Sequence, residues 1–192
     1  MYIDFTQSAK SLIADLFQDL ERATEDRNHP FRFCYLSTSQ VDHVPALRTV
    51  VLRKVLTSNE LLIFADYRTP KIQEIKLQPQ VALLFYHPKT QKQIRLQAMA
   101  TIHHQNTLSL QEWSKLGDYA KKDYQTILPP GSDLPLKDQG EIHDPNLGSN
   151  FFSIISLKPI NIDVLQLGNG RHHQRMLGEM NKGEWSGRKV IP

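Results

Sequence analysis

The feature that most constrains this chain is a change in the spacing of its apolar residues near residue 30. Between residues 6 and 26 apolar side chains recur at intervals of three and four, which predicts one amphipathic helix. Beyond Pro30 the spacing becomes the two-residue alternation of strands. Strands are expected at 31–38, 46–55, 61–65, 81–86, 93–101, 151–157, 160–167, 172–177 and 185–191. The pattern therefore predicts a mainly β protein with peripheral helices, its antiparallel strands arranged as a meander or barrel.

Two further helices are expected beside these strands. Residues 69–78 begin with a plausible cap and have Pro70 at the first helical position. Residues 107–124 carry a second helical pattern that breaks near Gly117. Prolines and glycines then interrupt residues 128–150, which predicts a long loop. We expect one domain over residues 1–192, with the N-terminal helix within residues 1–28.

Composition narrows the class of protein. No apolar run approaches the roughly 20 residues that span a bilayer, and Asp4 and Gln7 stand where a signal peptide has its apolar core, so we expect a soluble, cytoplasmic protein. The only cysteine, Cys34, excludes an internal disulfide and is expected to be a buried apolar group. The 23 basic and 20 acidic residues leave a formal charge of +3, which permits an anionic ligand without requiring nucleic acid.

The motifs of dinucleotide-binding folds, phosphate-loop ATPases, zinc proteases and serine hydrolases are absent. Three cationic groups could bind an anion in another way. Arg48 and Arg53 lie in one expected strand, where their spacing puts them on opposite faces unless a bulge intervenes. Lys71 lies in the first turn of an expected helix, where a cation opposes the helix dipole unless an anion binds there. Solvated side chains would explain both groups equally well.

The third group is Arg171, His173 and Arg175, which alternate and would share one face of a strand. Like charges on one face repel each other, and a bound anion would explain why they are tolerated. A metal site at His172–His173 or His103–His104 is disfavoured, because adjacent strand residues point to opposite faces and no third ligand is evident. We therefore expect no metal.

In their order along the chain, these groups resemble the pyridoxamine 5′-phosphate oxidase family of flavin-binding split barrels. That family has an Arg-x-Val-Leu-Leu-Lys strand, a Ser-Arg-Lys helix start, a Pro-x-Ala/Ser-Leu-x-Phe strand, an Arg-Gln-Val-x-Val strand, an Arg-x-His-x-Arg strand and a Trp-x-x-x-Arg-Leu-x-Pro carboxy terminus. The corresponding residues here are 48–53, 69–71, 79–85, 92–96, 171–175 and 185–192. The resemblance covers about residues 44–104 and 151–192, and it implies a six-stranded antiparallel FMN-binding split barrel.

The resemblance also implies roles for individual residues. The residues that would bind FMN within one subunit are Arg48 and Lys71 at its phosphate, the backbone of Val50 and Val51, the pair Phe64 and Ala65, and Arg53 at the end of the first motif. Gln93 and Arg175 would reach the flavin from the neighbouring subunit of a homodimer, which places FMN at the subunit interface. Arg171 and His173 would contact the substrate and serve as the catalytic pair.

Three positions depart from the family pattern: Arg53 replaces a lysine that helps bind substrate phosphate, Pro70 replaces an arginine, and Leu165 replaces a tryptophan. The family's Tyr, Arg and Ser clamp for pyridoxine phosphate is not found in residues 106–125. The expected function is an FMN-dependent oxidoreductase that passes a hydride from a small substrate to flavin N5, with reoxidation by oxygen. The alternatives are a flavin- or haem-handling protein without turnover and, less favoured, a nucleic-acid module.

Overall fold

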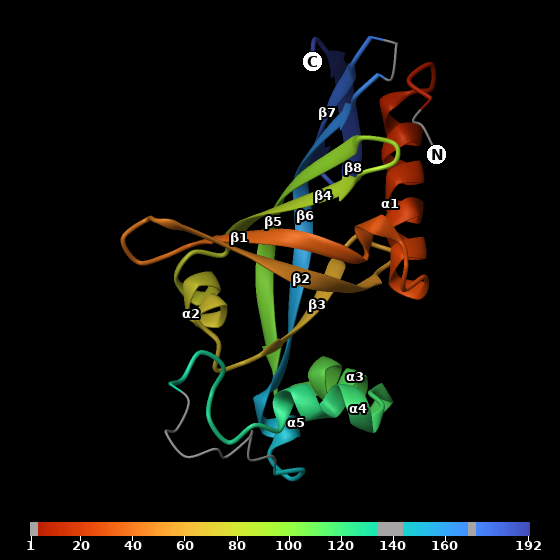
Figure 1. The fold of residues 1–192 in the computed structure, drawn as a ribbon. Coiled ribbons are helices and arrows are strands. Elements are labelled where there is room, and N and C mark those ends of the chain that lie inside the picture. Colours follow the sequence, from red (N-terminus) through yellow and green to blue (C-terminus); the bar gives the residue numbers. More distant parts are fainter. Residues whose placement is uncertain (1–3, 134–143, 169–171) are drawn as a thin grey trace.

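Strand β3 closes the barrel, because it pairs with β2 along one edge and with β6 along the other. The computed structural model describes residues 4–133, 144–168 and 172–192. Within them one antiparallel sheet runs in the order β3-β2-β1-β4-β5-β6-β7-β8. The strands are β1 (Phe33–Ser39), β2 (Pro45–Val55), β3 (Leu61–Asp66), β4 (Gln80–His87), β5 (Lys92–His104), β6 (Phe152–Gln166), β7 (Gln174–Asn181) and β8 (Glu184–Val190). The expected six-stranded barrel is confirmed, and β7 and β8 extend the sheet beyond it (Figure 1).

Alternation along the strands separates an inner from an outer face. In β1, Cys34 and Leu36 are fully buried, whereas Phe33 and Tyr35 remain about half exposed. Cys34 is thus the buried apolar group expected from its sequence context, and burial raises the pKa of its thiol to about 12. Because a slip of one residue would exchange the two faces, this pattern also sets the register of the sheet.

The sequence pattern was wrong about β6 and about the starts of two other strands. Two strands were expected around Pro159, but β6 is one continuous strand. The pairing with β5 shifts between Gln97 and Ala98, so a bulge in β6 takes up the proline without ending the strand. Two starts also differ: residues 30–32 form a short 3₁₀ helix, η1, and β7 begins only at Gln174.

Helix α1 (Ala9–Glu25) corresponds to the expected N-terminal helix and lies beside the barrel and the β7–β8 extension (Figure 1). Ser8 caps it by accepting a hydrogen bond from the backbone of Ser11. Its apolar side buries Leu12, Ile13, Leu16, Phe17, Leu20 and Ala23. The same side carries Asp19, whose Oδ2 lies 2.6 Å from Nζ of the buried Lys92 on β5. A buried ion pair therefore ties α1 to the barrel.

The other helices lie at the opposite end of the barrel (Figure 1). They are α2 (Pro70–Leu77), α3 (Thr107–Lys115), α4 (Asp118–Lys121), the 3₁₀ helix η2 (Lys122–Tyr124) and α5 (Gly148–Phe151). The helix of residues 69–78 and the break near Gly117 are both confirmed. A second hydrophobic core joins α3 and η2 to the sheet through Leu62, Tyr124, Phe152 and Ile154, with Trp113 packed against it, whereas α2 packs into the main core. Within the loop expected at 128–150, residues 134–143 lie outside the described residues, and α5 begins at Gly148.

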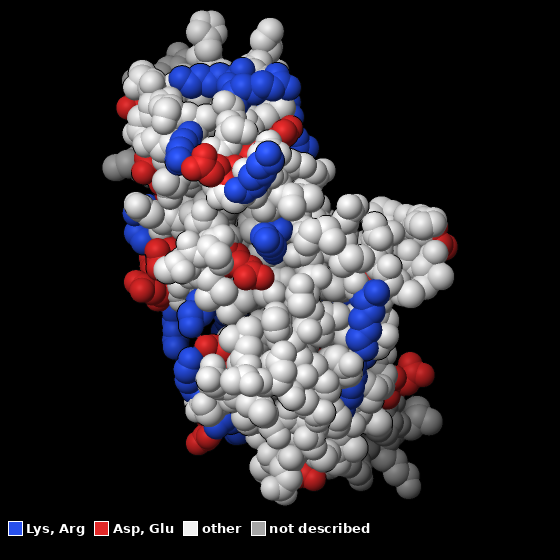
Figure 2. Space-filling view, turned by 180° about the vertical axis from the view of Figure 1, so that it is seen from behind, with Lys and Arg blue, Asp and Glu red and all other residues white. Residues whose placement is uncertain are grey.

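Charged side chains of both signs are spread over the face shown in Figure 2, with wide uncharged areas between them. Tyr86, Leu47 and Phe33 are among the large apolar side chains with substantial exposure. Among the described residues, no helix combines the length and apolar character needed to cross a membrane.

Candidate functional site

Arg48 projects from the inner face of β2 and is fixed by groups from two other elements. Its Nη2 donates to Glu74 Oε2 on α2 at 2.8 Å. Its Nη1 donates to the hydroxyl of Thr38 on β1 and to the carbonyl of Leu36. Thr38 in turn donates to Glu74, and both of these partners are buried. The guanidinium group of Arg48 is thus held in one place beside α2.

Lys71 lies in the first turn of α2, and its Nζ donates to Thr69 Oγ1 at 3.0 Å. No side chain caps this helix, because the buried Thr69 hydroxyl donates to the carbonyl of Asp66 instead. Burial, followed by the nearby charge of Arg48, lowers the pKa of Lys71. Two cations from different elements therefore lie close together at an uncapped helix start, an arrangement that favours a bound anion such as a phosphate group.

Arg68 lies in the loop between β3 and α2 and pairs with Asp66 at the end of β3. Its guanidinium forms a bidentate ion pair with Asp66, with 2.7 Å between Nη2 and Oδ2. It also donates to the carbonyls of Thr126 and Ile127, and it lies 3.6 Å from the centre of the Phe151 ring. The Asp66 carboxylate is thus paired outside the Arg48–Lys71 pair, and Arg68 joins this loop to the segment that follows η2.

Arg53 contacts different residues from those that hold Arg48. A bulge in the β2–β3 pairing lies between Leu52 and Lys54, and the Arg53 guanidinium stands 5.6 Å from the centre of the Phe64 ring. Phe64 packs edge-on against Phe152 in the second core. Arg48 and Arg53 thus occupy different surroundings, one beside α2 and one beside the aromatic residues.

The other expected flavin-site residues of β2 and β3 lie between the surroundings of Arg48 and those of Arg53. Val50 is buried and Val51 is half-buried between Arg48 and Arg53 along β2. Ala65, on β3, is buried, and its carbonyl accepts a hydrogen bond from Ser153. β2 and β3 therefore form one continuous wall along which the residues expected at the flavin are arranged.

Gln93 and Arg175 lie in one row on the outer face of the sheet. Both stand opposite Leu165 of β6, Gln93 from the β5 side and Arg175 from the β7 side. The partners of Arg48 and of Arg175 have no residue in common, because Arg175 pairs with Asp163. Within one chain, Arg48 and Arg175 therefore lie in separate surroundings.

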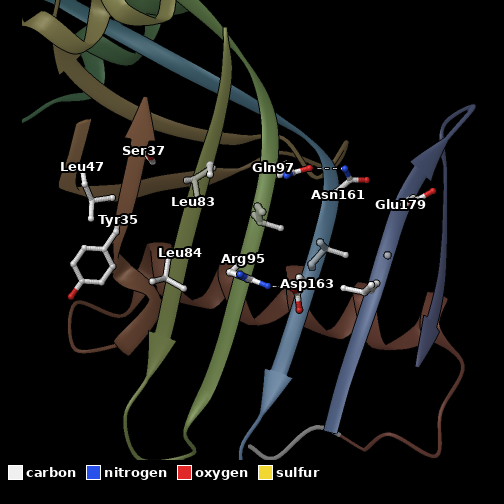
Figure 3. A pocket seen from close by; sticks show the side chains of 15 residues that line it. Tyr35, Ser37, Leu47, Leu83, Leu84, Arg95, Gln97, Asn161, Asp163 and Glu179 are labelled. Carbon is white, nitrogen blue, oxygen red and sulfur yellow. Dashed lines mark hydrogen bonds and ion pairs between the residues drawn. The ribbon is translucent and has the colours of Figure 1, made fainter. Parts of the chain in front are cut away.

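The outer face is hollowed into an open groove of about 460 Å³. Figure 3 shows Tyr35, Leu47 and Leu84 on one side of it and the Arg95–Asp163 and Gln97–Asn161 pairs on the other, with α1 behind the sheet. The exposed fraction of Leu47 is 68% and that of Tyr35 is 45%. This groove is a sheet face with apolar side chains that nothing in the described chain covers.

The late cationic group was only partly predicted. Arg171 lies outside the described residues, and His173 precedes β7, so the expected strand face does not include it. His173 is exposed, and its Nδ1 accepts a hydrogen bond from the backbone of Gly168 at 3.0 Å. The described residues contain no group of three or more side chains placed to hold a metal ion.

Four polar residues of the site were missed: Thr38, Glu74, Asp66 and Asp163. Thr38 and Glu74 are partners of Arg48, and Asp163 is the partner of Arg175. Asp66 pairs with Arg68. Each of the four comes from a different element. The one signal that could have found Asp163 is that it is the only charged residue of the strand expected at 160–167. Thr38 and Glu74 show no comparable signal in the sequence.

Known proteins are similar to this chain in sequence. The sequence model described as pyridoxamine 5′-phosphate oxidase, FMN-binding domain, matches residues 14–104. A pyridoxine/pyridoxamine 5′-phosphate oxidase of Aliarcobacter butzleri is 26% identical over 174 residues, covering 82% of this chain and 78% of that protein.

Solved structures give the same result over more of the chain. A pyridoxamine 5′-phosphate oxidase-related, FMN-binding protein from Nostoc punctiforme superposes with a TM-score of 0.76 at 26% identity, covering 93% of this chain and 96% of that one. PhzG from Burkholderia lata shares the fold, with a TM-score of 0.76 at 14% identity and coverage of 100% and 98%. The chain is therefore similar, in sequence over residues 14–104 and in fold over most of its length, to the pyridoxamine 5′-phosphate oxidase-like FMN-binding split barrels.

Proposed function

We propose that this protein is a flavoprotein oxidoreductase that binds FMN, with Arg48 and Lys71 at the phosphate. The observation that carries the proposal is the pairing of these two cations at the uncapped start of α2. Glu74 offsets part of their charge and fixes Arg48, while Asp66 is already paired with Arg68. The pair thus retains positive charge and backbone N–H groups for a phosphate, so these residues fit the group that the family binds.

The flavin ring would lie along the wall formed by β2 and β3. The backbone of Val50 and Val51 would border it, and Phe64 and Ala65 would contact it from the neighbouring strand. Arg53, which lies over Phe64, would mark the end of the cofactor site furthest from Lys71. Support for this placement comes from the antiparallel pairing of β2 with β3, in which Leu52, next to Val51, stands opposite Ile63, next to Phe64.

The complete site would need two copies of the chain. Gln93 and Arg175 lie on the outer face, whereas Arg48 faces inward beside α2. A homodimer formed through the groove would bury Tyr35 and Leu47 and bring Gln93 and Arg175 of the second copy to the flavin. The exposed apolar side chains of the groove support this assembly.

When bound, FMN supplies two-electron chemistry by accepting a hydride at N5. We propose that Arg171 and Arg175 provide positive charge beside the flavin and that His173 orients a small substrate. The substrate would lose a hydride and a proton, and molecular oxygen would take up both electrons and two protons to give hydrogen peroxide. Because the family's phosphate clamp is absent from residues 106–125, the substrate itself is left open.

The cofactor proposal is tested by titrating the purified protein with FMN and with riboflavin, which lacks the phosphate. We expect absorbance near about 450 nm for bound oxidised flavin. Lys71→Met and Arg48→Gln should each weaken FMN binding about 10- to 100-fold, since a hydrogen bond to a charged group contributes about 1.5–3 kcal/mol. Riboflavin affinity should stay unchanged in both variants. Lys76→Met, on the same helix but bonded to Tyr67, is the matched control.

A colourless protein that takes up no added FMN would refute the cofactor proposal. Turnover is tested separately by oxygen consumption with pyridoxine 5′-phosphate as the probe and Arg171→Leu as the variant. We expect Arg171→Leu to lower turnover while FMN stays bound. Loss of FMN from that variant with unchanged turnover per remaining flavin would contradict the assigned role. Bound flavin without bleaching by any reduced substrate would favour a flavin-handling protein instead.

A further inference from the structure

Asp163 stands between two arginines on the outer face of the sheet, and Figure 3 shows its pairing with one of them, Arg95. Arg95 lies directly opposite it on β5, whereas its partner on β7 is Leu177 and Arg175 lies two pairs further along that strand. Arg175 Nε donates to Oδ1 at 3.0 Å and Arg175 Nη2 donates to Oδ2 at 2.8 Å, while Arg95 also donates to Oδ2. One carboxylate thus accepts hydrogen bonds from both arginines.

The two contacts differ in geometry. Arg175 uses two nitrogen atoms on two carboxylate oxygens, which fixes the plane of its guanidinium group as well as its position. Arg95 uses a single nitrogen, and its side chain is 52% exposed against 31% for Arg175. Asp163 therefore determines the orientation of Arg175 far more than that of Arg95.

The charge of Asp163 also supports its role in orienting Arg175. Burial alone would raise the pKa of Asp163, but the hydrogen bonds from Arg175 and Arg95 lower it below its usual value. The carboxylate is thus ionised at neutral pH and leaves the three-residue cluster with one net positive charge. Side-on pairing through Nε and Nη2 directs the Nη1 edge of Arg175 away from Asp163, so this edge can donate to another acceptor.

We propose that Asp163 is the positioning residue of Arg175: it holds the guanidinium group in the orientation in which Arg175 reaches the flavin across the subunit interface. The inference rests on the proposed function, in which Arg175 supplies positive charge to the cofactor site. Asp163 acts only through Arg175 and has no contact with the cofactor itself.

The test compares Asp163→Asn, Arg175→Gln and the double variant, each measured as the FMN dissociation constant and the midpoint potential of the bound flavin. We expect both single variants to weaken FMN binding about tenfold, equivalent to about 1.4 kcal/mol. Both should also make the midpoint potential more negative. Arg175→Gln removes the positive charge beside the anionic reduced flavin, and Asp163→Asn lets the Arg175 guanidinium group move away from it. The double variant should be no weaker than Arg175→Gln, since the two residues act as a unit.

A purely electrostatic role for Asp163 predicts the opposite sign. Removing one negative charge near the flavin would then tighten FMN binding and make the potential more positive, and either result would overturn the proposal. Additive losses in the double variant would overturn it as well. Glu179→Gln removes a charge from the same face without touching Arg175 and so measures the general effect of charge.

Asp163→Glu keeps the charge and displaces the carboxylate, so it should recover part of the affinity lost in Asp163→Asn. If Asp163→Asn does not fold, as judged by circular dichroism, the same cycle is measured with Asp163→Glu, for which additive losses with Arg175→Gln would refute the proposal. A wild-type protein that binds no FMN refutes the proposed function. FMN binding with an unaffected Asp163→Asn variant refutes the positioning role alone.

Discussion

Replacing Asp19 by Asn removes the counter-charge of a lysine that is almost completely shielded from solvent. The side chain of Lys92 is 4% exposed, its Nζ lies 2.6 Å from Asp19 Oδ2, and it stands 5.0 Å from the centre of the Phe31 ring. Breaking such a pair from one side costs about 3–5 kcal/mol, because the remaining charge stays buried. For a chain of this size we expect the melting temperature to fall by about 6–20 °C.

Acid should weaken the same pair. Burial alone would raise the pKa of Asp19, but hydrogen bonds from Lys92 and Arg22 lower it from 3.8 to about 2. At 1.36 kcal/mol per pKa unit this is worth about 2.4 kcal/mol, which solvent screening reduces to about 1–2 kcal/mol. Because the folded-state pKa is the lower one, this stabilisation is fully present above about pH 4 and is lost as the pH falls towards 2. Asp19→Asn should lack this pH dependence.

The measurement is urea unfolding between pH 2 and 7, with the cofactor concentration held constant because a bound ligand adds to stability. Circular dichroism reports the fold, and fluorescence reports both tryptophans, Trp113 and Trp185, of which Trp185 has its ring 5.8 Å from that of Phe17 on α1. Asp15→Asn, on the exposed side of α1, is the control and should stay within about 0.5 kcal/mol.

The double variant Asp19→Leu, Lys92→Met gives the sharpest outcome. Apolar residues of similar volume can replace a buried ion pair at little cost, so this variant should recover most of the stability lost in Asp19→Asn. A loss below about 1 kcal/mol in Asp19→Asn, or a double variant as unstable as the single one, would show that the pair is not the buried tie described above.

Three further outcomes are expected from other parts of the fold. Gly178→Ala should cost about 1–3 kcal/mol in urea unfolding, because the added Cβ would lie 2.6 Å from Cγ2 of Ile162. Arg68→Met should lower the melting temperature by about 5 °C or more, since it removes the ion pair with Asp66 and the hydrogen bonds to Thr126. Cys34 should resist thiol reagents at pH 8 in the folded protein and react after unfolding, because burial raises its pKa to about 12.

Features that depend on neighbouring residues could be predicted from the sequence. The 3.6-residue spacing located α1, Pro70 located the start of α2, and Gly117 located the break between α3 and α4. The two-residue alternation located the barrel strands to within a few residues. Each of these signals is local, and each prediction was correct because the tertiary contacts favour the same local structure.

The features that could not be predicted depend on partners from distant strands. The continuity of β6 through Pro159 needs a bulge that exists only in its pairing with β5. Arg48 was predicted as an anion-binding residue, but its carboxylate partner Glu74 comes from a helix two elements away. Asp163 became interpretable only when the register placed it beside Arg175. Side-chain pairing across strands is set by topology, which local spacing does not encode.

Closure of the barrel by β6 has a consequence for how this chain folds as it is synthesised. β6 begins at Phe152, and its pairing joins Leu61 to Leu157 across nearly half of the sequence. Until those residues have left the ribosome, β3 and β5 each keep one open edge, so the region matched by the FMN-binding family, which ends at residue 104, cannot complete itself. Contacts this far apart slow folding, and open edges in the meantime invite pairing with other chains. The strand that closes the barrel is therefore made well after β2 and β3, the strands that we propose to line the cofactor.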